Sequence, residues 1–124
     1  MSKQSISISV VTILITIVVM LGLFKNMFSQ TPNASLSEAV KNGAFLVDVR
    51  TPGEFASGSV KDAVNIPLDK VQSQISKFKD KKTVVVFCRS GGRSSQAKSI
   101  LEQNGIQNVI NGGTWQNVNQ ALNE

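Results

Sequence analysis

The stretch of residues 83–95, TVVVFCRSGGRSS, constrains this chain most, because it joins an apolar strand to a glycine-rich turn and a helix. Val84 to Phe87 are apolar without interruption, and such a run of β-branched and aromatic residues is typical of a strand buried on both faces. Directly after it comes Cys88, the one cysteine of the chain. From Ser94 onward apolar residues recur at helical spacing, so Cys88 is predicted to lie at a strand-to-helix turn.

The turn after Cys88 has the features of an anion-binding loop. Gly91 and Gly92 can adopt positive φ, which lets successive backbone N–H groups point into one concavity, and the following helix adds the positive end of its dipole. Arg89 and Arg93 add full positive charges. Each of these effects favours the thiolate, so the pKa of Cys88 is expected to be low.

The residue types present narrow the chemistry of this thiol. A lone cysteine after a strand is often a small core residue, but the glycines and arginines around it serve no packing purpose and favour a reactive thiol. The chain has no histidine, which excludes a Cys–His dyad. It has no second cysteine, which excludes an internal disulfide, a cysteine-only metal site and a dithiol cycle. We therefore expect no metal and no cofactor, and persulfide chemistry is the natural use of a solitary thiol.

Two motifs together resemble the signatures of a known family. One is the loop CRSGGRS at residues 88–94, and the other is LVDVRTPGEF at residues 46–55. The second motif continues through Gly58, Ala63, Asn65, Ile66 and Pro67. Both resemble the rhodanese family of sulfurtransferases, and the resemblance extends from about Ser35 to the C-terminus. The chain departs from the family pattern at Ser59, where many relatives have histidine, and at Asp62, where glycine is common.

The resemblance implies a three-layer α/β fold with a central parallel sheet, and the activity of a single-domain thiosulfate sulfurtransferase. It implies that Cys88 takes the outer sulfur of a small anionic donor such as thiosulfate as a persulfide, and passes it to cyanide or a thiol. The acceptor thiol can belong to a partner protein. The positions that match the family's substrate-binding loop are Arg89, Ser90, Gly91, Gly92, Arg93 and Ser94. The resemblance implies that Asp48 and Arg50 brace the site, but for Arg50 a salt bridge with Glu54 is the favoured expectation.

Several assignments stay open at this level. One of the two loop arginines is free to point to solvent, and Ser90 is either a hydrogen-bond donor or merely a small loop residue. Trp115 is expected in the core, with a place in the pocket wall as its alternative. The whole chain is alternatively a persulfide carrier or a non-catalytic rhodanese-like binding module. A phosphatase or arsenate-reductase-like activity is disfavoured, because the loop of cysteine phosphatases is one residue longer between cysteine and arginine.

The N-terminal residues predict a membrane segment. Residues 6–24 carry no charge, and this length of helix spans roughly the 30 Å of a bilayer's hydrocarbon core. Residues 1–28 are thus read as an uncleaved anchor or signal segment, 29–34 as a linker and 35–124 as the rhodanese-like domain. A single-pass anchor is predicted to place the domain on the outer, periplasmic side of a bacterial cytoplasmic membrane. The alternative is a cleaved signal and secretion to the periplasm, which the absence of an A-x-A pattern in residues 25–30 disfavours.

The charge pattern argues against nucleic acid as a partner. The net charge of +5 is modest, and the lysines form no stripe with interleaved aromatic residues. A basic cluster precedes the apolar strand at Lys77, Lys79, Lys81 and Lys82. It is interpreted as a solvated turn, with a docking surface for anionic lipid or an acidic partner as the alternative.

Strands alternate with helices along the rest of the domain, which indicates a parallel sheet covered on both faces. Before the apolar strand the signals predict a helix from Ser35 closed by Gly43, a strand at 45–49, a helix at 51–58, a strand at 63–66 and a helix capped by Asp69. After the glycine-rich turn they predict a helix ending at Asn104, a strand at 108–110, a turn at Gly112 and Gly113, and a helix from Trp115. Ligands of such sheets bind at the carboxyl ends of the strands, where Cys88 falls.

Overall fold

The computed structural model describes residues 11–18 and 32–124 of the chain. The chain divides into two compact units, Met1–Pro32 and Asn33–Glu124. In the first unit, residues 11–18 form an exposed helix, and the predicted membrane segment at 6–24 lies largely outside the described residues. Within the described ranges, none of the helices has the length and apolar character needed to cross a membrane.

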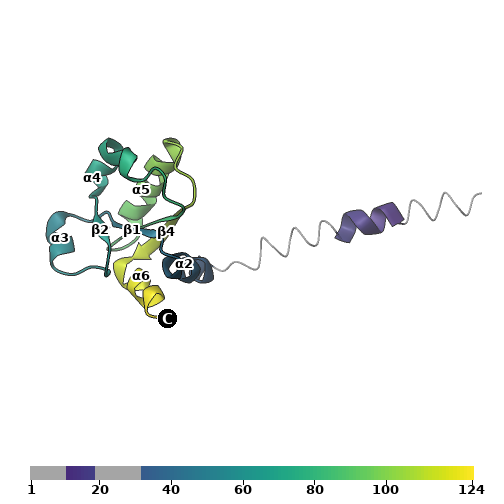
Figure 1. The fold of residues 1–124 in the computed structure, drawn as a ribbon, viewed down its shortest axis with the longest axis horizontal. Helices are drawn as coiled ribbons and strands as arrows, with labels where there is room; N and C mark the ends of the chain where they lie inside the picture. Colours follow the sequence, from purple (N-terminus) through teal and green to yellow (C-terminus); the bar gives the residue numbers. More distant parts are fainter. Residues whose placement is uncertain (1–10, 19–31) are drawn as a thin grey trace, which may run out of the picture. The chain divides into compact units, whose positions relative to one another are not determined.

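The second unit is built around a parallel sheet (Figure 1). The strands are β1 (Phe45–Asp48), β2 (Val64–Asn65), β3 (Val84–Cys88) and β4 (Val109–Thr114). Their order across the sheet is β2-β1-β3-β4, and each neighbouring pair is parallel. All five residues of β3 are fully buried, because β1 and β4 flank the strand and helices cover both of its faces. The predicted central strand is confirmed, and it ends at Cys88.

Helices cover both faces of the sheet, which confirms the predicted α/β layering (Figure 1). The helices are α2 (Pro32–Lys41), α3 (Pro52–Ala56), α4 (Leu68–Val71), the 3₁₀ helix η1 (Gln72–Lys77), α5 (Gly92–Gln103) and α6 (Trp115–Leu122). Alternate residues of β3 point to opposite faces, as the pleat requires. Val84, Val86 and Cys88 join the core cluster under α4 and α5, whereas Val85 and Phe87 join the cluster under α2 and α6.

Two helix starts differ from the predictions. Helix α2 begins at Pro32, so part of the predicted linker at 29–34 is helical and the Ser35–Glu38 capping signal lies inside the helix. Asp69 is not an N-cap, because α4 begins at Leu68 after Pro67, with no side-chain cap bond. The prediction failed because Pro67, with φ at −55°, already starts the turn, and its carbonyl accepts the Lys70 N–H at 2.8 Å.

The predicted turn at Gly112 and Gly113 is wrong, because strand β4 includes both glycines. The register of β4 against β3 shifts there, with Val86 opposite Asn111 and Phe87 opposite Gly113. This leaves Gly112 as the extra residue of a β-bulge. A Cβ on Gly112 would lie 2.5 Å from Val118 Cγ2, so only glycine lets α6 pack this closely on the strand.

Candidate active site

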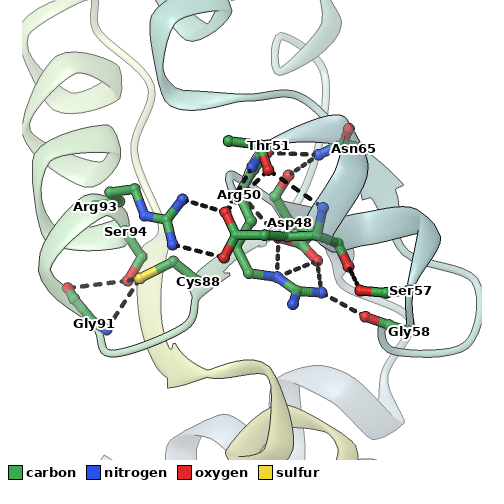
Figure 2. Close-up of polar contacts among 11 residues, drawn as sticks. Asp48, Arg50, Thr51, Ser57, Gly58, Asn65, Cys88, Gly91, Arg93 and Ser94 are labelled. Carbon is green, nitrogen blue, oxygen red and sulfur yellow. Dashed lines mark hydrogen bonds and ion pairs between the residues drawn. The ribbon is translucent and has the colours of Figure 1, made fainter.

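The loop that holds Cys88 is a tight connection from β3 to α5. Gly91 is the N-cap of α5 and has left-handed backbone angles, φ 96° and ψ −13°, which glycine adopts without steric cost. In this conformation the Gly91 N–H donates a hydrogen bond to Cys88 Sγ at 3.0 Å (Figure 2). The Cys88 side chain is fully buried, as a core cysteine would be, but it is also bound by a main-chain amide of the loop.

Ser94 contacts the same sulfur. It is fully buried in the first turn of α5, and its Oγ lies 3.4 Å from Cys88 Sγ (Figure 2). Burial by itself raises the pKa of the Cys88 thiol, but hydrogen bonds from the Ser94 hydroxyl and from the amides of Ser94, Ser90 and Gly91 outweigh it. The pKa of Cys88 is thus lowered, in the direction expected from the sequence.

The two arginines of the loop have different environments. Arg89 is exposed, and across residues 32–124 its side chain makes no ion pair with another residue. Arg93 is only partly exposed and forms a bidentate pair with Glu54 of α3, with Nη1 to Oε1 at 2.7 Å and Nη2 to Oε2 at 3.1 Å. The hydrogen bond from Arg93 is the main reason that the pKa of Glu54 falls to about 2. Of the two positive charges expected at the loop, the charge of Arg93 is therefore paired with the Glu54 carboxylate.

Asp48 and Arg50 form a buried ion pair at the carboxyl end of β1. Arg50 Nη2 lies 2.7 Å from Asp48 Oδ2, and the two side chains are 5% and 0% exposed. Arg50 Nε donates to both carboxylate oxygens at 3.0 Å, and Nη2 also donates to the carbonyl of Gly58 at 2.6 Å (Figure 2). Ser59 Oγ donates to Asp48 Oδ2 at 2.7 Å, so the residue that departs from the family pattern supports this carboxylate.

The expected salt bridge between Arg50 and Glu54 is wrong. Glu54 accepts from Thr51 in the predicted capping box of α3, which is confirmed, and its carboxylate then faces Arg93. Arg50 instead turns toward Asp48 and lies over the ring of Trp115, with 5.4 Å from Cζ to the ring centroid. Trp115 is half-buried against the core cluster of α2 and α6, as expected for a core residue, and its ring also faces the braced arginine.

Asn111 is a neighbour of the loop that the sequence reading missed. Its Oδ1 accepts from Ser94 Oγ at 2.7 Å and from Gly113 N at 3.0 Å, while its Nδ2 donates to the Gly91 carbonyl at 3.4 Å. The sequence does contain a signal for this residue, since Asn111 is a polar residue at a strand end directly before two glycines. The wrongly predicted turn at those glycines obscured it.

The amino ends of the strands carry a separate cleft of about 910 Å³, lined by residues that include Phe45, Thr83 and Val109. It lies at the opposite end of the sheet from Cys88, and none of the predicted site residues lines it. The predicted basic cluster borders this end and is exposed, with Lys81 Nζ 4.7 Å from the centroid of the Phe45 ring.

Fold and site together define a class of proteins, namely α/β domains with a cysteine in an amide-lined loop at the carboxyl end of a central parallel strand. The model of the rhodanese-like domain family matches residues 32–116. This chain belongs to that family, and the resemblance seen in its two motifs is confirmed.

Several of its relatives carry sulfurtransferase names. The chain is 37% identical over 87 residues to a sulfurtransferase of Allochromatium vinosum, which covers 68% of this chain and 81% of the relative. It is 41% identical over 69 residues to the thiosulfate sulfurtransferase PspE of Escherichia coli, which covers 54% of this chain and 66% of the relative.

Solved structures give the same result. One described as rhodanese with anions from E. coli has a TM-score of 0.55 and 37% identity, and covers 59% of this chain and 88% of that one. Human single-domain sulfurtransferase TSTD1 has a TM-score of 0.58 and 26% identity, over 68% of this chain and 88% of that one.

Proposed function

We propose that this protein is a sulfurtransferase that moves a sulfane sulfur from an anionic donor such as thiosulfate to a thiophilic acceptor, through a persulfide on Cys88. The observation that carries the proposal is the hydrogen bond from the Gly91 N–H to Cys88 Sγ at 3.0 Å. Three of the similar proteins are named sulfurtransferases, which supports the reaction class, and one of these three is named a thiosulfate sulfurtransferase, which supports the donor.

In the first half-reaction the Cys88 thiolate attacks the outer sulfur of thiosulfate. A bond forms between Cys88 Sγ and that sulfur, the bond between the two sulfurs of thiosulfate breaks, and sulfite leaves with its electron pair. The negative charge then resides on the outer sulfur of the persulfide. Main-chain N–H groups fixed around the loop favour this anion, because they need no reorganisation when the charge arrives.

In the second half-reaction cyanide or a thiolate attacks the outer sulfur, and Cys88 leaves as the thiolate that began the cycle. The thiolate is a good leaving group because its pKa is lowered by the Ser94 hydroxyl and the loop amides, despite burial. Since Cys88 has no exposed surface, the donor reaches it only if part of the loop moves. Arg89, Ser90 and Gly92 are the exposed residues of the loop, so the proposal places the movement there.

The test is a cyanolysis assay with thiosulfate on the full chain. We expect Cys88→Ser to lose all turnover, and intact mass spectrometry of thiosulfate-treated wild type to show the added mass of one sulfur atom. Ser99→Ala is the matched control, because Ser99 is an exposed residue of the same helix α5 and lies outside the site. Turnover by Cys88→Ser at the wild-type rate would show that the catalytic proposal is wrong.

The same mass measurement separates catalysis from a persulfide carrier. A carrier would show the sulfur adduct but would lose it to a partner protein and hardly at all to cyanide. A non-catalytic binding module would show no adduct.

We also propose that residues 6–24 anchor the protein in the cytoplasmic membrane with the domain on the outer side. The absence of charge over this stretch supports the proposal. N-terminal sequencing of protein from the membrane fraction tests it, because a mature N-terminus between residues 29 and 35 would show a cleaved signal instead.

A further inference from the structure

The hydroxyl of Ser94 has one hydrogen and three acceptors within reach. Asn111 Oδ1 lies at 2.7 Å, the Gly91 carbonyl at 3.1 Å and Cys88 Sγ at 3.4 Å. The two lone pairs of the Gly91 carbonyl already accept from the Ser95 N–H at 3.0 Å and from Asn111 Nδ2 at 3.4 Å. The shortest contact of the hydroxyl is therefore to a residue on a different strand, and the longest is to the sulfur of the proposed nucleophile.

The orientation of the Asn111 amide decides which way these hydrogen bonds run. The bulge at Gly112 brings the Gly113 N–H back to the Asn111 side chain, where it donates to Oδ1 at 3.0 Å. An N–H group needs an acceptor, so the carboxamide oxygen faces it and therefore also faces Ser94. That oxygen cannot donate, so Ser94 donates to Asn111. A thiol at Cys88 then donates its S–H to Ser94 Oγ, in a chain from Cys88 through Ser94 to Asn111.

Ionisation of Cys88 reverses the first link of this chain. A thiolate has no hydrogen to give and only accepts, so the Ser94 hydroxyl must turn away from Asn111 to serve the sulfur. Asn111 and the thiolate thus compete for a single hydrogen.

We propose that Asn111 is a positioning residue for the sulfur-transfer reaction, which acts through the Ser94 hydroxyl and sets how readily that hydroxyl donates to the Cys88 sulfur. The proposal rests on the proposed function only in taking Cys88 as the reacting thiol. It assigns a role to a residue of β4, outside the loop from Cys88 to Ser94 that the sequence singled out.

The charged groups near the sulfur are the same in the wild type and in a variant that replaces Asn111 by alanine. They are Arg89 and Arg93 in the loop, the Glu54 carboxylate that pairs with Arg93, and the buried pair of Asp48 and Arg50. Asn111 itself is exposed, so its replacement removes no core packing. Asn111 also donates to the Gly91 carbonyl through Nδ2 at 3.4 Å, and Gly91 itself binds the sulfur, so the effect that passes through the Ser94 hydroxyl has to be separated from this second route. Removing the Ser94 hydroxyl in a double variant makes that separation.

The test measures the pH dependence of Cys88 alkylation by iodoacetamide in the full chain. Cys88 is the one cysteine, so the alkylation rate reports it directly and requires no sulfur-transfer activity. Asn111→Ala removes the competing acceptor and is expected to lower the midpoint of the profile by about one pH unit, the size of one hydrogen bond to a charged group. Asn111→Asp keeps the acceptor and adds a negative charge, and is expected to raise the midpoint.

The double variants provide the control. In a Ser94→Ala background the hydroxyl is gone, so adding Asn111→Ala is expected to leave the midpoint unchanged. The proposal is overturned if Asn111→Ala raises the midpoint or leaves it at the wild-type value, or if its shift persists without the Ser94 hydroxyl. If Asn111→Ala fails to fold, Asn111→Asp decides, since a midpoint at or below wild type contradicts the proposal. Failure of the proposed function is a separate result, seen as absent cyanolysis with these shifts intact.

Discussion

Replacement of Gly112 by alanine tests how closely α6 packs against the bulge of β4. The added Cβ would lie 2.5 Å from Val118 Cγ2 and 3.0 Å from Val85 Cγ1. Both valines are fully buried, and β-branched side chains have little freedom at χ1, so neither can turn away. Either α6 shifts outward or the strand bends, and in both cases native packing is lost.

Overpacking of this kind typically costs about 1–3 kcal/mol of unfolding free energy. For a domain of this size the loss corresponds to a fall in Tm of about 5–20 °C. Thermal unfolding followed by tryptophan fluorescence measures it, because Trp115 is the one tryptophan and begins α6, two residues after the second glycine of the bulge.

Gly53→Ala is the matched control for this substitution. A Cβ there meets no atom within 4 Å, and alanine suits the first turn of α3 better than glycine, so Tm is expected to stay or rise slightly. If Gly112→Ala and Gly53→Ala unfold at the same temperature, the packing argument at the bulge is refuted.

Two further predictions concern the ion pairs of the site. Asp48→Asn leaves the buried Arg50 without its counter-charge and is expected to lower the unfolding free energy, measured in urea, by about 3–5 kcal/mol. Ser59→Ala removes a single hydrogen bond to Asp48, and a loss for Asp48→Asn no greater than the loss for Ser59→Ala would contradict the prediction. The hydrogen bond from Arg93 lowers the pKa of Glu54 from 4.5 to about 2, so the stabilisation by this pair is complete above pH 4.5 and is lost as the pH falls through about 2. Glu54→Gln is expected to be less stable than wild type at neutral pH and to converge with it in strong acid, and an offset that is equal at both pH values would exclude this linkage.

Much of the fold could be predicted because it depends on signals within a few residues of one another. The run from Val84 to Phe87 can hardly be anything but a buried strand, and the capping box at Thr51 and Glu54 closes within a single turn. The position of Cys88 at a strand-to-helix turn follows from the same local signals.

The wrong predictions concern residues for which more than one partner or position is compatible with the local sequence. Arg50 had carboxylates at Asp48 and Glu54 within a few residues, and only the packed structure directs it to Asp48 while Glu54 turns to Arg93 of α5. The residue type of Asp69 suits an N-cap, but the proline two residues before it already begins the turn.

Gly112 and Gly113 likewise separate what the sequence predicts from what the packing decides. By composition they predict a turn, but α6 packs so closely on the strand that the pair is needed as a bulge inside β4. That bulge brings Asn111 to Ser94, a contact between residues 17 positions apart.

The amino-acid sequence by itself determined the central strand, the glycine-rich loop, the solitary thiol and the family, because these are local patterns of residue type and spacing. Only the tertiary structure decided which carboxylate each arginine pairs with, how deeply the thiol is buried, and which strand reaches the serine beneath it. These depend on side chains from separate elements that come within about 3 Å of each other only after the sheet and its helices have packed.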